Sequence, residues 1–200
     1  MTAELNDRLL FDAGFIKMVE RTASLDDQLI TRTVVTHLGA VVVVPVTTSG
    51  HAILIRQFRL AANAWVTELP AGKRDVDGEP AKETARRELA EECGVAASKL
   101  IRLCHFLNSP GFTDESTEIF LALGLTSVPR SPQSPEEAAA DVVSVRLDRV
   151  YELVASGALI DGKSIIGLTI ARDFLATPNG VAAAKGVSDS LVEPPLALPR

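Results

Sequence analysis

Apolar residues in the first sixty positions alternate with polar ones or gather in short runs, which is the pattern of β-strands. The runs at 15–21 and 28–37 flank the turn-rich segment 24–27 and predict a hairpin or paired arm that precedes the core. Two further runs, 40–46 and 52–58, flank a polar turn and predict two buried strands. The beginning of the chain is therefore expected to be rich in strands.

The pattern changes after a strand predicted at 65–69. A cluster of breaking residues, Pro70-Ala71-Gly72, leads into the polar loop 73–79, and the apolar positions that follow recur at helical spacing. Pro80 suits the first helical position, and Gly94 suits the C-cap. These signals predict one helix between Pro80 and Gly94.

The rest of the chain returns to strands and then to helices. The patterns indicate strands at 100–107, 118–125 and 142–147, followed by helices that should cover the sheet at 147–156 and 164–175. From residue 177 onward the sequence is rich in Ala, Gly and Pro and has no periodicity. That composition predicts a mobile tail without chemistry.

Composition and charge exclude several classes of protein. A chain of 200 residues with 46% hydrophobic and 23% charged residues fits one soluble domain. The net charge of −6 argues against nucleic-acid and anionic membrane partners. No basic start followed by an apolar run indicates a signal peptide, and the longest apolar run, 40–46, is too short to cross a bilayer. We interpret Cys93 and Cys104 as buried thiols in a reducing compartment and expect a cytoplasmic protein.

Candidate chemistry lies on the predicted helix. Glu88 stands three and four residues before Glu91 and Glu92, so the three carboxylates share one helical face. Negative charges this close repel one another unless a cation lies between them. Carboxylate oxygens are also ligands that Mg²⁺ prefers. A solvated acidic face is the alternative, but this set of residues with Arg87 at fixed offsets arises by chance roughly once in ten million starting positions. We therefore predict a metal site.

The same residues resemble the signature of the Nudix hydrolases, which cleave nucleoside diphosphates linked to another group. Residues from Glu79 through Arg87 to Val95 fit each defined position, but six residues instead of five separate Gly72 from Glu79. The longer loop looks like one found in some ADP-ribose pyrophosphatases. Gln57-Phe58-Arg59 and the segment 68–72 are also similar to the ADP-sugar branch, and the resemblance extends over about 38–175.

The resemblance implies roles for the motif residues. It places two or three Mg²⁺ ions, or Mn²⁺, on the following ligands: the Ala71 carbonyl, Glu88, Glu91 and Glu92. Glu91 and Arg87 belong to the catalytic cluster, and Arg87 forms an ion pair with Glu79 that anchors the loop to the helix. That pair could equally be a surface salt bridge worth under about 1 kcal/mol.

A second segment, residues 109–115, supplies the other expected catalytic group. Pro110 stands fifteen residues after Val95, a spacing that marks ADP-ribose hydrolases in the family, although Pro-Gly is also ordinary turn chemistry. By the resemblance, Glu115 orients or deprotonates the attacking water. Asp114 is the reserve candidate for that role.

Substrate contacts are expected from the arm and from one strand. Arg59 would bind a phosphate or the terminal ribose, and Arg32 would do so across a dimer interface, although either could be an exposed strand arginine. Phe11 and Phe15 are the aromatic residues of the arm that could stack on adenine. We interpret the remaining candidates as structural or core residues: His37, His51, His105, Trp65 and Tyr151.

Together these features predict an α/β protein with the Nudix fold, an α/β/α sandwich with mixed sheets and an N-terminal β-arm. Residues 1–36 would form the arm and a homodimer interface, 37–176 the hydrolase domain and 177–200 a flexible tail. The expected reaction is Mg²⁺-dependent hydrolysis of ADP-ribose to AMP and ribose 5-phosphate. Two alternatives remain: another nucleotide sugar such as UDP-glucose or GDP-mannose, and a non-catalytic Nudix ligand-binding regulator. The acidic charge disfavours RNA substrates.

Overall fold

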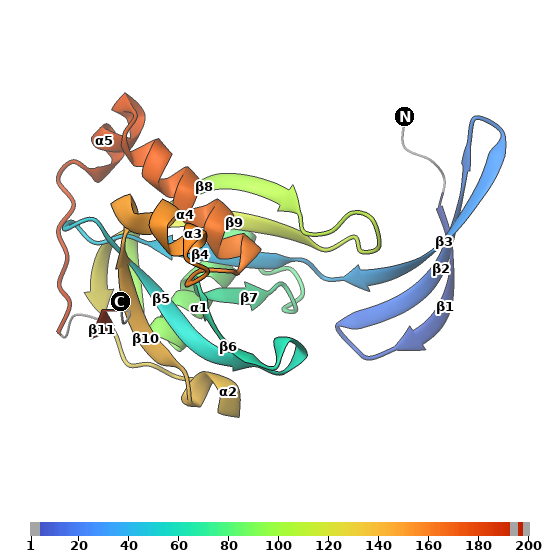
Figure 1. The fold of residues 1–200 in the computed structure, drawn as a ribbon, viewed down its shortest axis with the longest axis horizontal. Coiled ribbons are helices and arrows are strands. Elements are labelled where there is room, and N and C mark those ends of the chain that lie inside the picture. The colour runs from blue at the N-terminus through green and yellow to red at the C-terminus, as the bar shows by residue number, and fades with distance from the viewer. Residues whose placement is uncertain (1–4, 193–195, 198–200) are drawn as a thin grey trace.

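The computed structural model describes residues 5–192 and 196–197 of the chain. A three-stranded sheet stands apart from a larger body, in which two four-stranded sheets lie between helices (Figure 1). The body is an α/β/α sandwich with mixed sheets, and the separate sheet is an N-terminal β-arm, so the predicted fold class is confirmed. No helix in the described residues is both long and apolar enough to cross a membrane.

The arm consists of β1 (Leu5–Asp12), β2 (Ile16–Leu25) and β3 (Gln28–His37), all antiparallel. Asp26 and Asp27 connect β2 to β3 with φ angles of 51° and 62°, as a two-residue hairpin requires. The predicted hairpin is therefore confirmed. The sequence pattern did not indicate β1, because the polar positions 6–8 interrupt its apolar residues.

Two mixed sheets form the middle of the body. One has the order β7 (Ala71–Lys73), β4 (Ala40–Pro45), β9 (Ser116–Ser127), β8 (Val95–Leu107), and its β4–β9 pair is parallel. The other has the order β11 (Leu196–Ala197), β10 (Asp141–Arg146), β5 (His51–Arg59), β6 (Ala64–Glu68). The two predicted strands at 40–46 and 52–58 thus lie in different sheets.

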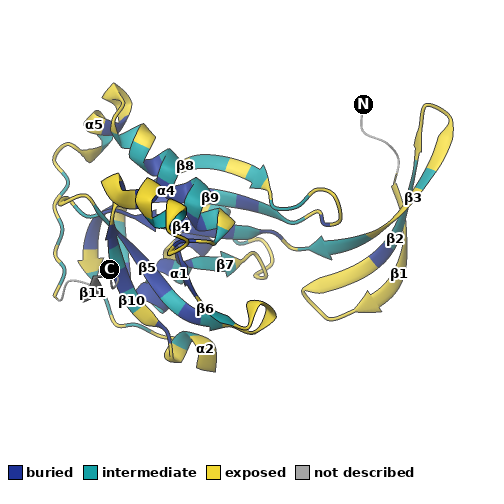
Figure 2. Cartoon of the chain, viewed as in Figure 1, coloured by how far each residue is buried: buried dark blue, intermediate teal, exposed yellow. Residues whose placement is uncertain are grey.

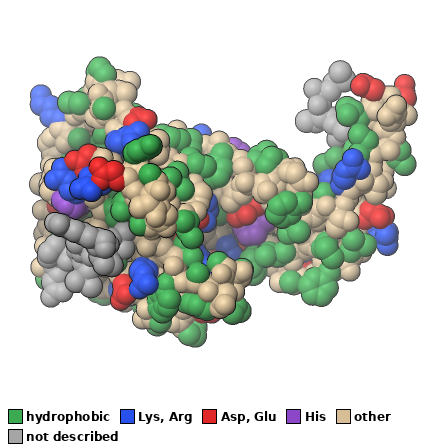
Figure 3. All heavy atoms as spheres, in the orientation of Figure 1, with side chains coloured by type: hydrophobic (Ala, Val, Ile, Leu, Met, Phe, Trp, Pro, Cys, Tyr) green, Lys and Arg blue, Asp and Glu red, His purple; other side chains and the backbone are tan. Residues whose placement is uncertain are grey.

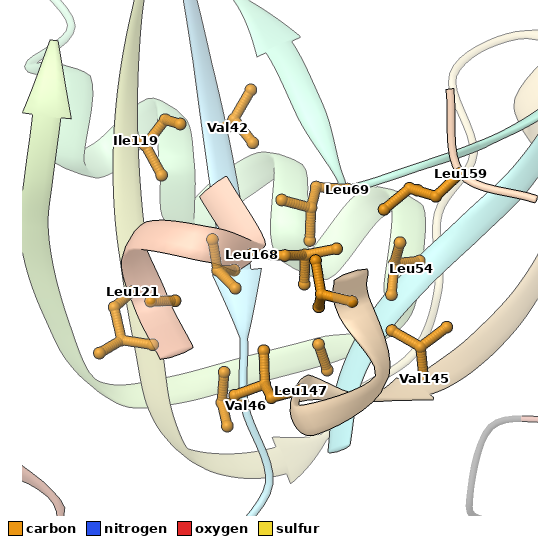
Figure 4. Close-up of a cluster of buried hydrophobic side chains, with 14 of the residues drawn as sticks. Val42, Val46, Leu54, Leu69, Ile119, Leu121, Val145, Leu147, Leu159 and Leu168 are labelled. Atoms are coloured by element: carbon orange, nitrogen blue, oxygen red, sulfur yellow. The ribbon is translucent and has the colours of Figure 1, made fainter. Parts of the chain in front are cut away.

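Both faces of β4 are buried, which explains its unbroken apolar run. Val41 and Val43 pack with Leu89 of α1 (Ala81–Cys93) in one cluster. Val42 and Val44 pack with Leu168 of α4 (Gly162–Leu175) in the other cluster (Figure 4). Helices therefore cover opposite faces of this sheet.

The helices begin and end close to the predicted positions. Pro80 is the N-cap of α1 and not its first helical residue, and Gly94 ends the helix with a φ of 65°. The segment predicted as one helix at 147–156 is divided into η2 (Leu147–Arg149) and α3 (Val150–Ala155). Short elements of this body that were not predicted include η1 (Leu60–Ala62), α2 (Pro135–Ala138), β7 and β11.

Two expectations are wrong. The segment after residue 177 is not without structure, because the Thr177 side chain caps α5 (Pro178–Ala184) and the Asp189 carboxylate accepts hydrogen bonds from Thr48. The rest of that predicted tail, 193–195 and 198–200, lies outside the described residues. Trp65 and Tyr151 are not core residues, since they are 46% and 75% exposed. The Trp65 ring instead lies under the Arg56 guanidinium on the outer face of the sheet, 5.3 Å from it.

Candidate active site

The centre of the site is the contact between β7 and α1. Gly72 lies so close to Glu88 that a Cβ at this position would overlap the Glu88 side chain. Only glycine leaves room for that carboxylate beside the strand. The glycine of the motif therefore has a steric role: it lets Glu88 approach β7.

Glu92 is the most deeply buried carboxylate of the motif. Its side chain accepts the Ala71 N–H at 2.9 Å, and the residue is 5% exposed. Burial raises the pKa of Glu92 to about 8, and the neighbouring Glu88 carboxylate adds to that rise. Burial also raises the pKa of Glu88. Two adjacent carboxylates are thus held in surroundings that disfavour their charged forms.

Arg87 supplies positive charge to the other side of this cluster. Its guanidinium donates to Glu79 at 3.2 and 3.3 Å, to Glu88 at 2.7 Å and to Glu91 at 3.2 Å. The hydrogen bond from Arg87 lowers the pKa of Glu79. The ion pair predicted between Arg87 and Glu79 is present, and the same arginine also binds two of the expected metal ligands.

The donor set fits a hard divalent cation. Carboxylate oxygens are the preferred ligands of such ions, and a cation would relieve the unfavourable charge of Glu88 and Glu92. Within the described residues, no three His, Cys, Asp or Glu side chains converge closely enough to form a finished metal cage. Arg87 donates to one oxygen of Glu88 and to one oxygen of Glu91, so each of these carboxylates keeps its other oxygen for a metal ion.

The loop 108–115, which we call the catalytic loop, joins β8 to β9 and carries both candidates for the base. The Asp114 carboxylate accepts the main-chain N–H of His37 at 2.9 Å and the Arg21 guanidinium at 3.3 Å. The Glu115 carboxylate lies 4.0 Å from His37 Nδ1. Asp114 is therefore held by the arm, whereas the Glu115 carboxylate has, among the described residues, only this longer approach to the His37 ring.

Arg59 lies at the end of β5 and contacts the start of the segment 68–72. Its Nε and Nη2 each donate to a different oxygen of the buried Glu68 carboxylate, both at 2.7 Å. Lys163 Nζ lies 3.9 Å from Glu68 and 2.6 Å from Asp161. The Glu68 hydrogen bond raises the pKa of Arg59, and the Glu92 charge contributes in the same direction. This interaction places Arg59 within electrostatic reach of the carboxylate cluster.

The structure separates the candidates on the arm. The Phe15 ring contacts His37 edge-on, with centroids 5.8 Å apart, and Lys73 Nζ lies 4.2 Å above its centre. Phe15 is thus close to both β7 and the catalytic loop. Arg32 is exposed on β3 and donates to the Thr31 carbonyl, and Phe11 is also exposed. Pro110 is exposed on the catalytic loop.

Several residues that lie near the site received no functional role in the sequence analysis. His37 was interpreted as structural, yet it contacts Phe15 and lies beside Glu115. Its position at the end of β3, just before the first core strand, was the available signal. Arg21 and Lys73 gave no signal because Asp114 and Phe15, which they contact, are distant in sequence, and the same holds for the approach of Lys163 to Glu68. Side chains of both charges gather where the body meets the arm (Figure 3).

Comparisons with known proteins agree with this geometry. Residues 36–164 match the model of the NUDIX domain. An ADP-ribose pyrophosphatase from Bacillus subtilis is 39% identical over 133 residues, covering 66% of this chain and 71% of that protein. An ADP-ribose pyrophosphatase from Mycobacterium tuberculosis is 34% identical over 169 residues, covering 84% and 80%. The crystal structure of an ADP compounds hydrolase shares the fold, with a TM-score of 0.73, 21% identity and coverage of 88% of this chain and 95% of that one. The chain therefore belongs to the Nudix family of hydrolases.

Proposed function

We propose that this enzyme hydrolyses the diphosphate of ADP-ribose and releases AMP and ribose 5-phosphate. The observation that carries the proposal is that both curated relatives described above are named ADP-ribose pyrophosphatases. The chain also retains Glu88, Glu91 and Glu92, which a binding regulator without turnover would not need. Hydrolysis of a nucleotide sugar is therefore favoured over regulation.

Nudix hydrolases generally need a divalent metal, and we infer Mg²⁺ here, in two or three ions that Mn²⁺ can replace. Glu88, Glu91, Glu92 and the Ala71 carbonyl would hold these ions. A bound divalent cation neutralises diphosphate charge and lowers the pKa of the attacking water. Arg87 steadies Glu88 and Glu91 through its hydrogen bonds and so acts within the catalytic cluster.

Glu115 is our choice for the group that accepts the proton of the attacking water. Its carboxylate is partly exposed and has His37 as a neighbour, so it can turn toward a substrate. Asp114 accepts two hydrogen bonds that fix its orientation. A base needs a free lone pair directed at water, which favours Glu115 over Asp114.

Arg59, Phe15 and Pro110 would contact the substrate within one chain. The ion pair with Glu68 uses one edge of the Arg59 guanidinium, Nε and Nη2, and its side chain is 45% exposed. The remaining N–H groups can bind a phosphate or the ribose. Phe15 offers an aromatic face for adenine beside β7, and Pro110 shapes the exposed side of the catalytic loop.

We infer a homodimer that forms through the arm. The arm exposes apolar side chains on all three strands, and Val19 is its one buried apolar residue among those described (Figure 2). A thin sheet of this kind is stabilised by a partner subunit. In such a dimer Arg32, which does not contact the body of its own chain in the described residues, would reach the substrate of the partner.

We also infer a cytoplasmic location, with neither nucleic-acid nor membrane partners. Cys93 and Cys104 are both free, and burial raises the pKa of the Cys93 thiol well above its usual value. Two unpaired thiols are typical of a reducing compartment. The charge of −6 does not favour binding to phosphate-rich surfaces.

The decisive experiment measures monophosphate release from a substrate panel in the presence of Mg²⁺. The panel contains ADP-ribose, UDP-glucose, GDP-mannose, NADH and diadenosine polyphosphates, and Glu92→Gln serves as the control for metal-dependent turnover. We expect ADP-ribose to have the highest kcat/KM and to give AMP and ribose 5-phosphate. A higher value for another sugar nucleotide would change the assigned substrate, and no turnover of any compound would favour the regulator.

A further inference from the structure

We infer that the arm holds the catalytic loop in position, and that Arg21 and Asp114 are the positioning residues that make this connection. The inference rests on the proposed function, in which Glu115 of that loop is the base. The inference goes beyond the proposed function because it gives the arm a role in catalysis within each chain, in addition to any role in dimerisation.

The main chain of β3 binds the catalytic loop directly. The Val35 N–H donates to the Phe112 carbonyl at 2.8 Å, and the Asp114 N–H donates to the Val35 carbonyl at 3.3 Å. Val35 and Thr113 form a parallel bridge, and Thr113 is buried. The tip of the β8–β9 hairpin is therefore attached to a strand of the arm, as the ribbon also indicates (Figure 1).

Side chains strengthen this attachment at Asp114. One carboxylate oxygen accepts the His37 N–H at 2.9 Å and the other accepts the Arg21 guanidinium at 3.3 Å. Arg21 is itself fixed by two hydrogen bonds of 2.8 Å to Asp7. Asp114 consequently connects the catalytic loop to β2 and β3, and Arg21 extends that connection to β1.

The attachment determines where Glu115 lies. Glu115 follows Asp114 directly, and its carboxylate is 4.0 Å from His37, the residue whose N–H Asp114 binds. The His37 ring is oriented by the Gly39 N–H, which donates to Nδ1 at 3.0 Å, and by the edge contact with Phe15. A displacement of the arm would therefore move the loop and the neighbour of the base together. Because misplacement of a catalytic group by about 1 Å can cost a hundredfold in rate, this coupling should appear in kcat.

The simpler alternative is that Arg21 and Asp7 only stabilise the arm, and that Asp114 is an incidental third partner. Exposed ion pairs usually contribute little to stability. The chain offers two matched controls for this alternative. Arg8→Ala and Lys17→Ala each remove a different exposed ion pair of the arm, with Glu20 and Asp12, and leave the connection from Asp7 through Arg21 to Asp114 intact.

The test compares Asp114→Ala, Asp114→Asn, Arg21→Ala and Arg21→Lys with these controls in the full-length protein. Three quantities are measured: kcat and KM for ADP-ribose, hydrogen exchange of residues 108–115, and sedimentation. We expect Asp114→Ala and Arg21→Ala to lower kcat about ten- to a hundredfold, with KM nearly unchanged and faster exchange in the loop. Asp114→Asn keeps an acceptor for the His37 N–H, so its loss should be smaller, and Arg21→Lys should recover part of the Arg21→Ala loss.

The inference is overturned if kcat and loop exchange are unchanged in Asp114→Ala. It is also overturned if Arg8→Ala or Lys17→Ala lowers kcat as much, because general stability of the arm would then explain the effect. Glu115→Gln is measured in parallel. Wild-type kcat in Glu115→Gln would show that Glu115 is not the base of the proposed function. Hydrogen exchange of residues 108–115 in the Asp114 and Arg21 variants would then be the measurement that tests whether the arm holds the loop.

Discussion

Three glutamates on one face of α1 have different surroundings, and these give them different chemistry. Glu92 is buried, and among the hydrogen bonds of the described residues its carboxylate accepts only the main-chain N–H of Ala71. Glu88 and Glu91 share Arg87. A carboxylate whose pKa is raised by burial gains most from a bound cation. The three residues are of the same type, so the burial of each side chain determines how much it gains from a bound cation.

Replacing Glu92 should separate metal binding from folding. Folding raises the pKa of Glu92 from 4.5 to about 8, so the folded protein binds this proton more tightly than the unfolded chain. The resulting stabilisation is complete below about pH 4.5 and is lost as the pH rises toward 8. Metal-free Glu92→Gln should therefore melt several degrees above the wild type at pH 8, as measured by differential scanning calorimetry. Mg²⁺-dependent kcat should fall at least tenfold. Near wild-type kcat at saturating Mg²⁺ would mean that Glu92 is not a ligand of the catalytic metal.

Replacing Glu115 should affect the chemical step. Glu115→Gln should lower kcat by about 10²- to 10⁴-fold and change KM for ADP-ribose little, because a base acts in the transition state. Steady-state kinetics under saturating Mg²⁺ measure both constants. If Asp114→Asn caused this loss and Glu115→Gln did not, the base would be Asp114.

At the scale of elements, the site depends on two helices, α1 and α4, which hold the short segment between β6 and β7 from opposite sides. On one side Glu88 and Glu92 of α1 contact Gly72 and Ala71. On the other, the buried Ser164 hydroxyl at the start of α4 accepts the Leu69 N–H at 2.7 Å. The same hydroxyl donates to Asp161, the N-cap residue of α4, at 2.6 Å. The segment between β6 and β7 is therefore fixed before any ligand binds.

Enlarging Gly72 should remove function but keep the fold. The Cβ of Gly72→Ala would overlap the movable end of the Glu88 side chain, so the carboxylate would have to leave β7. We expect the Mg²⁺ concentration for half-maximal activity to rise at least tenfold, with a melting temperature near that of the wild type. Gly162→Ala is the control, since no atom lies within 4 Å of its added Cβ. Wild-type metal dependence in Gly72→Ala would show that Glu88 does not need this position.

Removing the Ser164 hydroxyl should weaken both the fold and the site. Ser164→Ala leaves the buried Leu69 N–H without its acceptor, which should cost about 1–3 kcal/mol in urea denaturation. Activity should require more Mg²⁺, because Leu69 precedes Ala71, whose carbonyl is a proposed metal ligand, by two residues. Thr177→Ala removes the N-cap of α5 far from the site and should cost about 1 kcal/mol without changing the Mg²⁺ dependence. If Ser164→Ala and Thr177→Ala showed the same Mg²⁺ dependence, Ser164 would contribute to the stability of the fold and not to metal binding.

At the scale of the whole molecule, the arm has two surfaces with separate expected roles. Its end nearest the body contacts β7 and the catalytic loop through Phe15 and Val35. Its strands expose apolar side chains such as Leu9 and Phe11, which are 55% and 61% exposed. Contacts within one chain and contacts between two chains can therefore be tested independently.

Placing charge on the exposed strand should dissociate the proposed dimer. Leu9→Glu/Phe11→Glu leaves Phe15 and Val35 intact but makes burial of β1 against a partner unfavourable. Sedimentation should show particles of 21.3 kDa in place of dimers. KM for ADP-ribose should rise, because Arg32 of a partner would no longer reach the substrate. A variant that stays dimeric, or a monomer with unchanged KM, would contradict this role of the arm.

The sequence alone determined the elements that local patterns encode. The period of the apolar residues and the positions of Pro80 and Gly94 predict α1 almost to the residue, because capping and periodicity are local properties. The spacing of Glu88, Glu91 and Glu92 likewise predicts a common helical face. The pair between Arg87 and Glu79 followed from the family motif and is present.

Tertiary structure decided what depends on neighbours distant in sequence. The buried strands β4 and β5 join different sheets, since sheet partners are chosen by packing on both faces. The strand β1, whose apolar residues are interrupted by the polar positions 6–8, forms because β2 offers it a partner. Asp114 and Glu115, adjacent and nearly equivalent in sequence, differ because Arg21 and the His37 N–H reach only the former. The pKa of Glu92 is raised because the fold buries it, which residue spacing cannot reveal.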